Sequence, residues 1–207
     1  EADNIAAKLR AAAYHVAKVS KKRTSRQPAP PFITSTLQQE AWRKLDFTAQ
    51  RTMAIAQQLY EGLPIGEEGV VGLITYMRTD STRVADSAIK ETRGYIKKKF
   101  GAELVPAHHR LFAKKVKGAQ EAHEAIRPTR IEHEPGLLAP YLTPEQAKLY
   151  ELIWKRMVAS QMATAQFDNT AVDIEAEEPQ EKKTYLLRAT SSVPYFLGFL
   201  RAVEDRG

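Results

Sequence analysis

Tyr76 and Arg78 stand two residues apart in the string GLITYMRTDST at residues 72–82, and their side chains could act together on a phosphate. A phenol can attack the phosphorus of a phosphodiester, while a guanidinium holds the phosphate oxygens and offsets the charge that develops on them. In an extended segment, residues two apart face the same side, so both groups could reach one phosphate. The pair predicts a tyrosine nucleophile with an arginine clamp.

A packing role fits the same pair. A free phenol has a pKa of about 10, so it is a poor nucleophile at neutral pH unless a neighbouring cation or base lowers the cost of losing its proton. Tyrosines also commonly fill space in a core. In this second interpretation, Tyr76 is a half-buried core residue and Arg78 is an ion-pair partner at the surface.

His123, in the string QEAHEAIRPT, is the second candidate for catalysis. A histidine can hydrogen-bond a phosphate oxygen or move a proton near neutral pH, and Glu121 or Glu124 could orient its ring. It could equally be a capping or packing histidine. Arg127 could be a second phosphate contact or hold the fold through an ion pair, and the sequence leaves both roles open.

Three carboxylates in the pattern D-x-E-x-E, at Asp173, Glu175 and Glu177, could suggest a magnesium site. They fall on one face of an alternating, strand-like segment, and no glycine turn follows them. A solvated strand face explains this pattern better, so we assign no metal to it. The chain has no cysteine, which excludes disulfides and thiolate metal sites.

The composition is that of a globular protein, with 43% hydrophobic and 27% charged residues among 207. No apolar run approaches the roughly 18 residues of a membrane span, and no signal peptide is visible. The net charge of +6 favours a polyanionic partner such as nucleic acid. These features and the lack of cysteine are compatible with a cytoplasmic location.

Hydrophobic periodicity separates a helical middle of the chain from strand-like ends. Three prolines at positions 28, 30 and 31 predict a stiff connector between the two parts. We predict a predominantly helical α+β protein, in which a helical domain of residues 29–164 is inserted into a partial antiparallel β domain made of 1–28 and 165–207. Helices are expected at 3–13, after a cap at Ser35, after a cap at Thr48, at 86–100 and at 144–161, and strands at 14–22 and in two stretches after Ala165.

Five strings resemble segments of the bacterial type IA DNA topoisomerases, the ATP-independent enzymes that cut one DNA strand and pass another through. The strings occur in the order found in that family and cover most of residues 30–162. They are PPFITSTLQQEA (30–41), TMAIAQQLYEG (52–62), GLITYMRTDST (72–82), AQEAHEAIRPT (119–129) and LYELIWKRMVASQM (149–162).

The resemblance implies that Tyr76 attacks the scissile phosphate of a single DNA strand and forms a 5′-phosphotyrosyl bond. It implies that Arg78 contacts this phosphate and that His123 is the active-site histidine. We expect DNA contacts from Arg78, Thr79, Asp80 and Arg127. For the fold, the resemblance implies a helix-turn-helix-like core in the helical domain and strands that belong to the arch of the toroid-shaped enzyme. It also implies a bacterial protein of the cytoplasm that acts on the nucleoid.

The magnesium-binding TOPRIM domain of that family would precede this region. The chain begins at Glu1 inside a helical pattern and ends at Gly207 without a closing signal, so we interpret it as a piece of a longer protein. We therefore expect Mg²⁺ to be a cofactor of the full-length enzyme, held in the TOPRIM domain, and no metal to be held by this piece. The piece alone is expected to be inactive in DNA cleavage.

Two other classes of function remain open from the sequence. A non-catalytic, helix-turn-helix-like DNA-binding module would need an exposed recognition helix with Arg, Asn or Gln aimed at base edges. The best-marked helix, at 144–161, instead has an apolar stripe suited to packing. In a protein-interaction domain, Tyr76 and Arg78 would be incidental.

Overall fold

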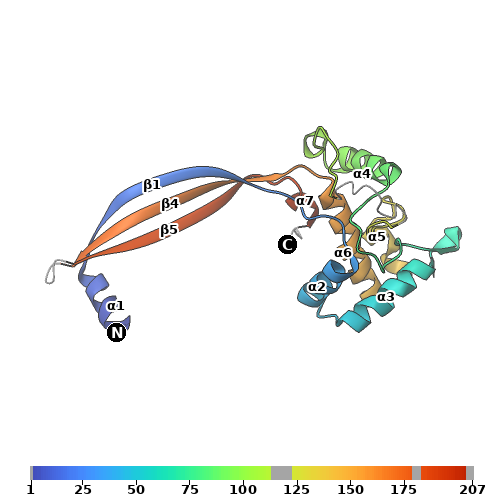
Figure 1. Cartoon of the computed structure of the whole chain (residues 1–207), viewed down its shortest axis with the longest axis horizontal. Helices are drawn as coiled ribbons and strands as arrows, with labels where there is room; N and C mark the ends of the chain where they lie inside the picture. Colours follow the sequence, from blue (N-terminus) through green and yellow to red (C-terminus); the bar gives the residue numbers. More distant parts are fainter. Residues whose placement is uncertain (1, 113–122, 179–182, 204–207) are drawn as a thin grey trace. The chain divides into compact units, whose positions relative to one another are not determined.

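The computed structural model describes residues 2–112, 123–178 and 183–203. The chain divides into two compact units. The β unit comprises Glu1–Arg26 and Ala165–Leu197, and the helical unit comprises Gln27–Thr164 and Gly198–Gly207. Figure 1 shows long strands in the first unit and packed helices in the second, so helices and antiparallel sheets are both present.

The β unit is a three-stranded antiparallel sheet in the order β1-β4-β5. The strands are β1 (Ala13–Arg26), β4 (Ala165–Glu178) and β5 (Lys183–Phe196), and the short helix α1 (Ala2–Ala11) precedes them in the chain. Val19, Val172 and Ala189 lie opposite one another across the three strands. The alternating patterns therefore predicted the strands correctly, although each strand is longer than the pattern that indicated it.

Cross-strand ion pairs occupy the acidic face of β4. Asp173 accepts hydrogen bonds from Arg188 on β5, the shorter of 2.6 Å, and Glu175 lies 2.8 Å from the imidazole of His15 on β1. The hydrogen bond from Arg188 holds the pKa of Asp173 below its usual value. These carboxylates thus pair with side chains of the same sheet.

The helical unit is built around α6 (Pro144–Ser160), which contacts helices on several sides (Figure 1). Its buried stripe includes Leu149, Tyr150, Ile153 and Met157, each at most 1% exposed. The helices in contact with it are α2 (Thr34–Leu45), α3 (Ala49–Glu61), α4 (Asp86–Lys99), α5 (Pro135–Leu138) and α7 (Leu200–Val203). Short elements complete the unit: a hairpin of β2 (Leu63–Pro64) and β3 (Val70–Val71), and the 3-10 turns η1 (Gly66–Glu68), η2 (Ala102–Leu104) and η3 (Ala139–Tyr141).

Local capping signals position two of the helices as predicted. The hydroxyl of Thr48 accepts a hydrogen bond from the N–H of Arg51 and starts α3. Thr143 and Gln146 form a reciprocal capping box at the start of α6, with the Gln146 side chain accepting from the N–H of Thr143 at 2.9 Å. Gly62, with φ of 114°, ends α3.

The start of α2 and the end of the chain differ from expectation. Ser35 is not a cap, because α2 already begins at Thr34 and the N–H of Ile33 donates to the hydroxyl of Thr36 at 3.1 Å. The sequence-based boundary placed all residues from 165 on in the β domain. Phe199 is instead buried in the helical unit, where its N–H donates to the carbonyl of Ala163 at 2.9 Å.

Residues 27–33, which contain the three prolines, connect β1 to α2. Pro28 and Pro31 are buried, and the next residue, Phe32, is fully inaccessible and bridges Ile126. Pro28, Pro31 and Phe32 therefore form part of the helical unit's core.

Among the helices of the described ranges, none combines the length and the apolar character that a membrane span requires.

Candidate active site

Residues 72–80 run through the helical unit between the end of α3 and residues 125–129. The N–H of Leu73 donates to the carbonyl of Leu59 at 2.7 Å, and the N–H of Thr129 donates to the carbonyl of Leu73 at 3.0 Å. Ile74 forms a bridge with Pro128. The backbone that leads to Tyr76 is therefore held from two sides.

From Tyr76 to Asp80, side chains alternate between the surface and the interior. Met77 is 1% exposed and Thr79 is 9% exposed, whereas Tyr76 is 44% exposed and Arg78 is exposed as well. The buried neighbours anchor the segment while the phenol of Tyr76 stays accessible. The Tyr76 ring is therefore half exposed, so the phenol can be reached from solvent while part of the ring packs against the protein.

Thr34, in the first turn of α2, fixes the backbone on both sides of Arg78. Its hydroxyl lies 2.7 Å from the carbonyl oxygen of Met77 and 3.0 Å from that of Thr79, and it accepts the N–H of Thr79 at 2.9 Å. The backbone N–H of Thr34 also donates to Thr79, at 2.9 Å. Sequence reasoning missed this residue, although a threonine at a helix start is a signal for such hydrogen bonds.

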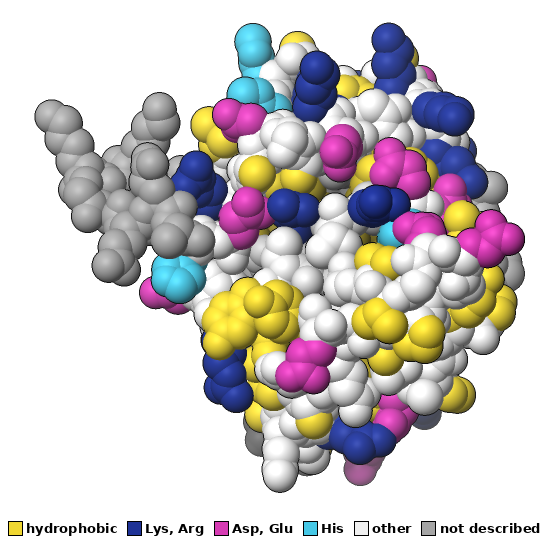
Figure 2. All heavy atoms as spheres, turned by 90° about the vertical axis from the view of Figure 1, so that its right-hand side faces the viewer, with side chains coloured by type: hydrophobic (Ala, Val, Ile, Leu, Met, Phe, Trp, Pro, Cys, Tyr) yellow, Lys and Arg dark blue, Asp and Glu magenta, His cyan; other side chains and the backbone are white. Residues whose placement is uncertain are grey.

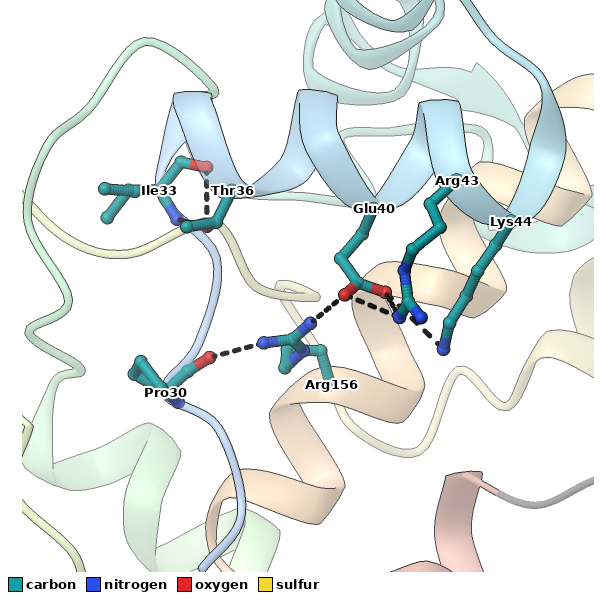
Figure 3. A network of polar contacts seen from close by, with 7 residues as sticks. All are labelled: Pro30, Ile33, Thr36, Glu40, Arg43, Lys44 and Arg156. Atoms are coloured by element: carbon teal, nitrogen blue, oxygen red, sulfur yellow. Dashed lines mark hydrogen bonds and ion pairs between the residues drawn. The ribbon is translucent and has the colours of Figure 1, made fainter. Parts of the chain in front are cut away.

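Helix α2 is itself tied to α6 through Arg156, as Figure 3 shows. The guanidinium of Arg156 lies 3.5 Å from the carboxylate of Glu40, donates to the carbonyl of Pro30 and stacks 4.1 Å from the ring centre of Phe32. Burial alone would raise the pKa of Glu40, but the hydrogen bond from Arg43 and nearby positive charges bring it below the usual value. This network keeps the helix that carries Thr34 in place.

Arg78 and Asp80 are both exposed. Within the part of the chain that the structure describes, neither side chain has a hydrogen-bond or ion-pair partner. Arg78 is thus not the surface ion-pair partner of the second interpretation, and its guanidinium is accessible to a ligand. Thr79 is different, because it is 9% exposed and its hydroxyl accepts the N–H of Ser81 at 3.1 Å, which gives it a role inside the fold.

Arg127 holds the fold through an ion pair. Its Nε donates to Glu124 at 2.8 Å, another guanidinium nitrogen donates to the carbonyl of Pro128 at 3.0 Å, and the side chain is only 13% exposed. Of the two carboxylates expected near His123, Glu124 is engaged with Arg127 and Glu121 lies outside the described residues. His123 itself is exposed.

Thr75 joins the segments of Tyr76 and His123. Its hydroxyl donates to the carbonyl of Ala125 at 2.7 Å and accepts the N–H of Arg127 at 3.0 Å. Its own N–H donates to the carbonyl of Arg127 at 2.9 Å. The neighbour of Tyr76 is therefore bonded to the stretch that begins with His123.

A second tyrosine, which sequence reasoning missed, contacts the candidate nucleophile. The rings of Tyr60 and Tyr76 are packed edge to face with their centres 5.3 Å apart. Tyr60 lies in the last turn of α3 and is 41% exposed. No short-range pattern in the sequence indicates this contact.

Basic side chains are exposed on the surface, interspersed with acidic ones. Figure 2 shows one face of the molecule on which Lys and Arg side chains gather in the upper part, with acidic side chains between them. Helix α4 ends with the exposed run Lys97–Lys99, of which Lys99 lies 3.0 Å from Glu134. Exposed lysines of this kind contact phosphates without reading sequence.

The described residues do not fit a magnesium site. They contain no group of three or more His, Asp and Glu side chains placed to hold a metal ion. Asp173 and Glu175, two of the three carboxylates in the D-x-E-x-E pattern, are bonded to Arg188 and His15.

Comparison with known proteins gives concordant results. The family model described as DNA topoisomerase matches residues 1–206. "DNA topoisomerase 1" of Xylella fastidiosa is 50% identical over 191 residues, covering 92% of this chain and 23% of the relative. "DNA topoisomerase 1" of Rickettsia bellii is 48% identical over 206 residues, covering 99% of this chain and 25% of the relative.

A solved structure also matches along the whole chain. It is that of full-length topoisomerase I from Thermotoga maritima, which is 38% identical, with a TM-score of 0.82, over 100% of this chain and 32% of that one. The chain thus spans about a quarter of the length of the curated relatives and a third of that structure.

Proposed function

The chain belongs to the DNA topoisomerase family, and on that premise we propose that it supplies the nucleophile, Tyr76, of a type IA DNA topoisomerase. The observation that carries the proposal is the exposure of the Tyr76 ring, 44%, on a backbone held between buried residues. Arg78, exposed two residues further on, provides the cation that such a nucleophile needs.

In the proposed reaction, the Oη atom of Tyr76 attacks the phosphorus of one DNA strand. A bond forms between Oη and phosphorus, and the bond between phosphorus and the 3′ oxygen breaks, so the 5′ end stays on the tyrosine. The phenol loses its proton to a base, and the departing 3′ oxygen gains one. Religation reverses each step. Since one ester replaces another, relaxation of supercoils needs no ATP.

Arg78 and His123 would act on the phosphate from two segments. The planar guanidinium of Arg78 can donate two hydrogen bonds to the non-bridging oxygens and offset the charge that grows on them in the transition state. His123 can donate to a phosphate oxygen or move a proton, and the hydrogen bonds of Thr75 join its segment to that of Tyr76. Asp80 is exposed beside them and could accept from a base amino group.

We further propose two functions that Tyr76 and Arg78 do not supply. Magnesium, which the resemblance implies for the full-length enzyme, would be held by carboxylates of a TOPRIM domain. The β unit would be part of the arch that opens for strand passage, acting on DNA in the bacterial cytoplasm. Because the proposed metal site lies in another domain, we expect this chain by itself not to cleave DNA.

A chimera tests the proposal. These 207 residues would replace the matching segment of DNA topoisomerase 1 from Rickettsia bellii, which is 48% identical. With magnesium and a single-stranded oligonucleotide, denaturing electrophoresis should show a covalent adduct that carries a 3′-end label but no 5′-end label. That polarity is what a 5′-phosphotyrosyl bond requires.

Two variants test whether Tyr76 is the nucleophile. Tyr76→Phe should abolish the adduct, while Tyr141→Phe, at another half-exposed tyrosine of the helical unit, should leave it unchanged. An adduct that still forms in Tyr76→Phe would show that Tyr76 is not the nucleophile. Binding to duplex DNA with a base preference and without any adduct would instead favour a non-catalytic DNA-binding module.

A further inference from the structure

The contact between Tyr60 and Tyr76 joins two residues that are distant in sequence and both half exposed. Their ring centres are 5.3 Å apart and their planes make an angle of 64°, an edge-to-face arrangement that aromatic pairs favour. The exposed fractions are 41% for Tyr60 and 44% for Tyr76. Each ring thus covers part of the other while leaving one side open to solvent.

Two glycines let the chain return to the end of α3. Gly62 has φ of 114°, and a Cβ there would lie 2.9 Å from Cγ1 of Val70. A Cβ on Gly72 would lie 2.7 Å from the carbonyl oxygen of Tyr60. The backbone of residue 72 can therefore lie directly against Tyr60 only because it carries no side chain.

The backbone of Tyr76 is fixed, but hydrogen bonds do not fix its ring. Leu73 and Thr75 bind neighbouring segments through their backbone N–H groups. No hydrogen bond to the Tyr76 side chain is found among the described residues. An exposed tyrosine can rotate about its side-chain torsions, so another contact must select the direction of the hydroxyl.

We propose that Tyr60 is a positioning residue for Tyr76, whose ring restricts the nucleophile to the orientation used for attack on the phosphate. This inference rests on the proposed function of Tyr76. In-line attack needs a near-aligned hydroxyl, and displacement by about 1 Å can cost about 100-fold in rate. Loss of the Tyr60 ring should therefore slow the chemical step while DNA binding stays unchanged.

Single-turnover cleavage in the chimera, at saturating oligonucleotide, measures the chemical step directly. We expect Tyr60→Ala to slow cleavage by about tenfold or more with an unchanged dissociation constant for DNA. Tyr60→Phe keeps the ring and should restore the parental rate. Tyr141→Ala removes a half-exposed tyrosine elsewhere in the unit and should have no effect.

A measurement without DNA tests whether the Tyr60 ring restricts the orientation of Tyr76. In the 207-residue chain with ¹³C-labelled tyrosine rings, NMR should show Tyr76 signals displaced by the ring current of Tyr60. In Tyr60→Ala these signals should move toward the values of a freely rotating tyrosine, while circular dichroism shows the helices retained.

Three results would overturn the inference. Parental cleavage by Tyr60→Ala would remove any role of the ring, and equal slowing in Tyr60→Phe would assign the role to the hydroxyl. Weakened DNA binding with an unchanged rate at saturation would make Tyr60 a DNA contact. The proposed role of Tyr76 is tested separately, because Tyr76→Phe must abolish the adduct in the same chimera. If Tyr76→Phe does so and one of the three results is found, only the inference about Tyr60 is wrong.

Discussion

The hydroxyl of Thr34 lies 2.7 Å from the carbonyl oxygen of Met77, the residue between Tyr76 and Arg78. This hydrogen bond links the first turn of α2 to the candidate active-site segment. Because α2 is in turn tied to α6 by Arg156 and Glu40 (Figure 3), the segment is connected to the core of the helical unit. The positions of the exposed Tyr76 and Arg78 side chains therefore depend on Thr34, which is partly buried.

Thr34→Val should destabilise the helical unit. Valine has nearly the same shape but leaves the N–H of Thr79 and the carbonyl of Met77 without their partner, a loss of about 1–3 kcal/mol. Urea unfolding of the 207-residue chain measures this. Ser35→Ala is the matched control, since Ser35 is exposed and does not cap α2, and its effect should stay within about 0.5 kcal/mol. A larger loss in Ser35→Ala than in Thr34→Val would contradict the assignment.

Gly72→Ala should be destabilising, and Gly94→Ala should not. The methyl group at residue 72 would meet the carbonyl oxygen of Tyr60 at 2.7 Å, and the forced shift should cost about 1–3 kcal/mol. At Gly94, inside α4, nothing lies within 4 Å of the new methyl group, so helix propensity should add about 0.5–1 kcal/mol. Thermal unfolding of the two variants should therefore shift in opposite directions. Equal shifts would show that Gly72 has no close neighbour in solution.

Helices with complete local signals could be predicted from the sequence. The caps at Thr48 and Thr143 lie next to the residues whose N–H groups they accept, so a short string contains the whole interaction. The start of α2 could not be predicted in the same way. Ser35 satisfies the capping pattern, but Thr34 is the residue whose long-range partners, Met77 and Thr79, determine the local backbone.

The candidate site could be predicted only where its residues lie close together in the sequence. Tyr76 and Arg78 lie in one string, and their exposure follows from the buried residues that alternate with them. Tyr60 approaches Tyr76 only after the chain turns at Gly62 and returns at Gly72, which no pattern of residue types reveals. Arg127 pairs with Glu124, which is one of its two expected roles, and a contact of Arg127 with DNA stays a prediction.

Glu40→Gln should lower stability in a pH-dependent way. The pKa of Glu40 is depressed in the folded chain, so its contribution is present above the unfolded value of 4.5 and is lost as the pH falls through the lower folded value. At pH 7 the variant leaves Arg156 without its carboxylate, and we expect a loss of about 1–3 kcal/mol. Urea unfolding at pH 7 and at about pH 3 should show the difference between parent and variant shrinking at the lower pH. A constant difference would mean that the charge of Glu40 is not what stabilises the fold.

The 207-residue chain alone should not cleave DNA. Its described residues contain no cluster that could hold magnesium, and the proposal assigns that ion to another domain. Supercoiled plasmid incubated with the chain and magnesium should remain uncut on agarose gels. Nicking that disappears in Tyr76→Phe would show instead that the chain contains a complete cleavage site.

Arg78→Lys in the chimera should slow cleavage and leave the fold intact. Lysine keeps the charge but cannot donate two parallel hydrogen bonds to one phosphate, as the planar guanidinium can. Loss of one preorganised donor to a developing anion typically costs about 100-fold or more, so we expect at least a tenfold decrease in the single-turnover rate. Because Arg78 has no partner among the described residues, unfolding curves should coincide with those of the parent. Arg201→Lys, at an exposed arginine of α7, serves as the control and should cleave at the parental rate. Parental cleavage by Arg78→Lys would remove bidentate phosphate binding from the mechanism and leave Arg78 at most a point charge near the DNA.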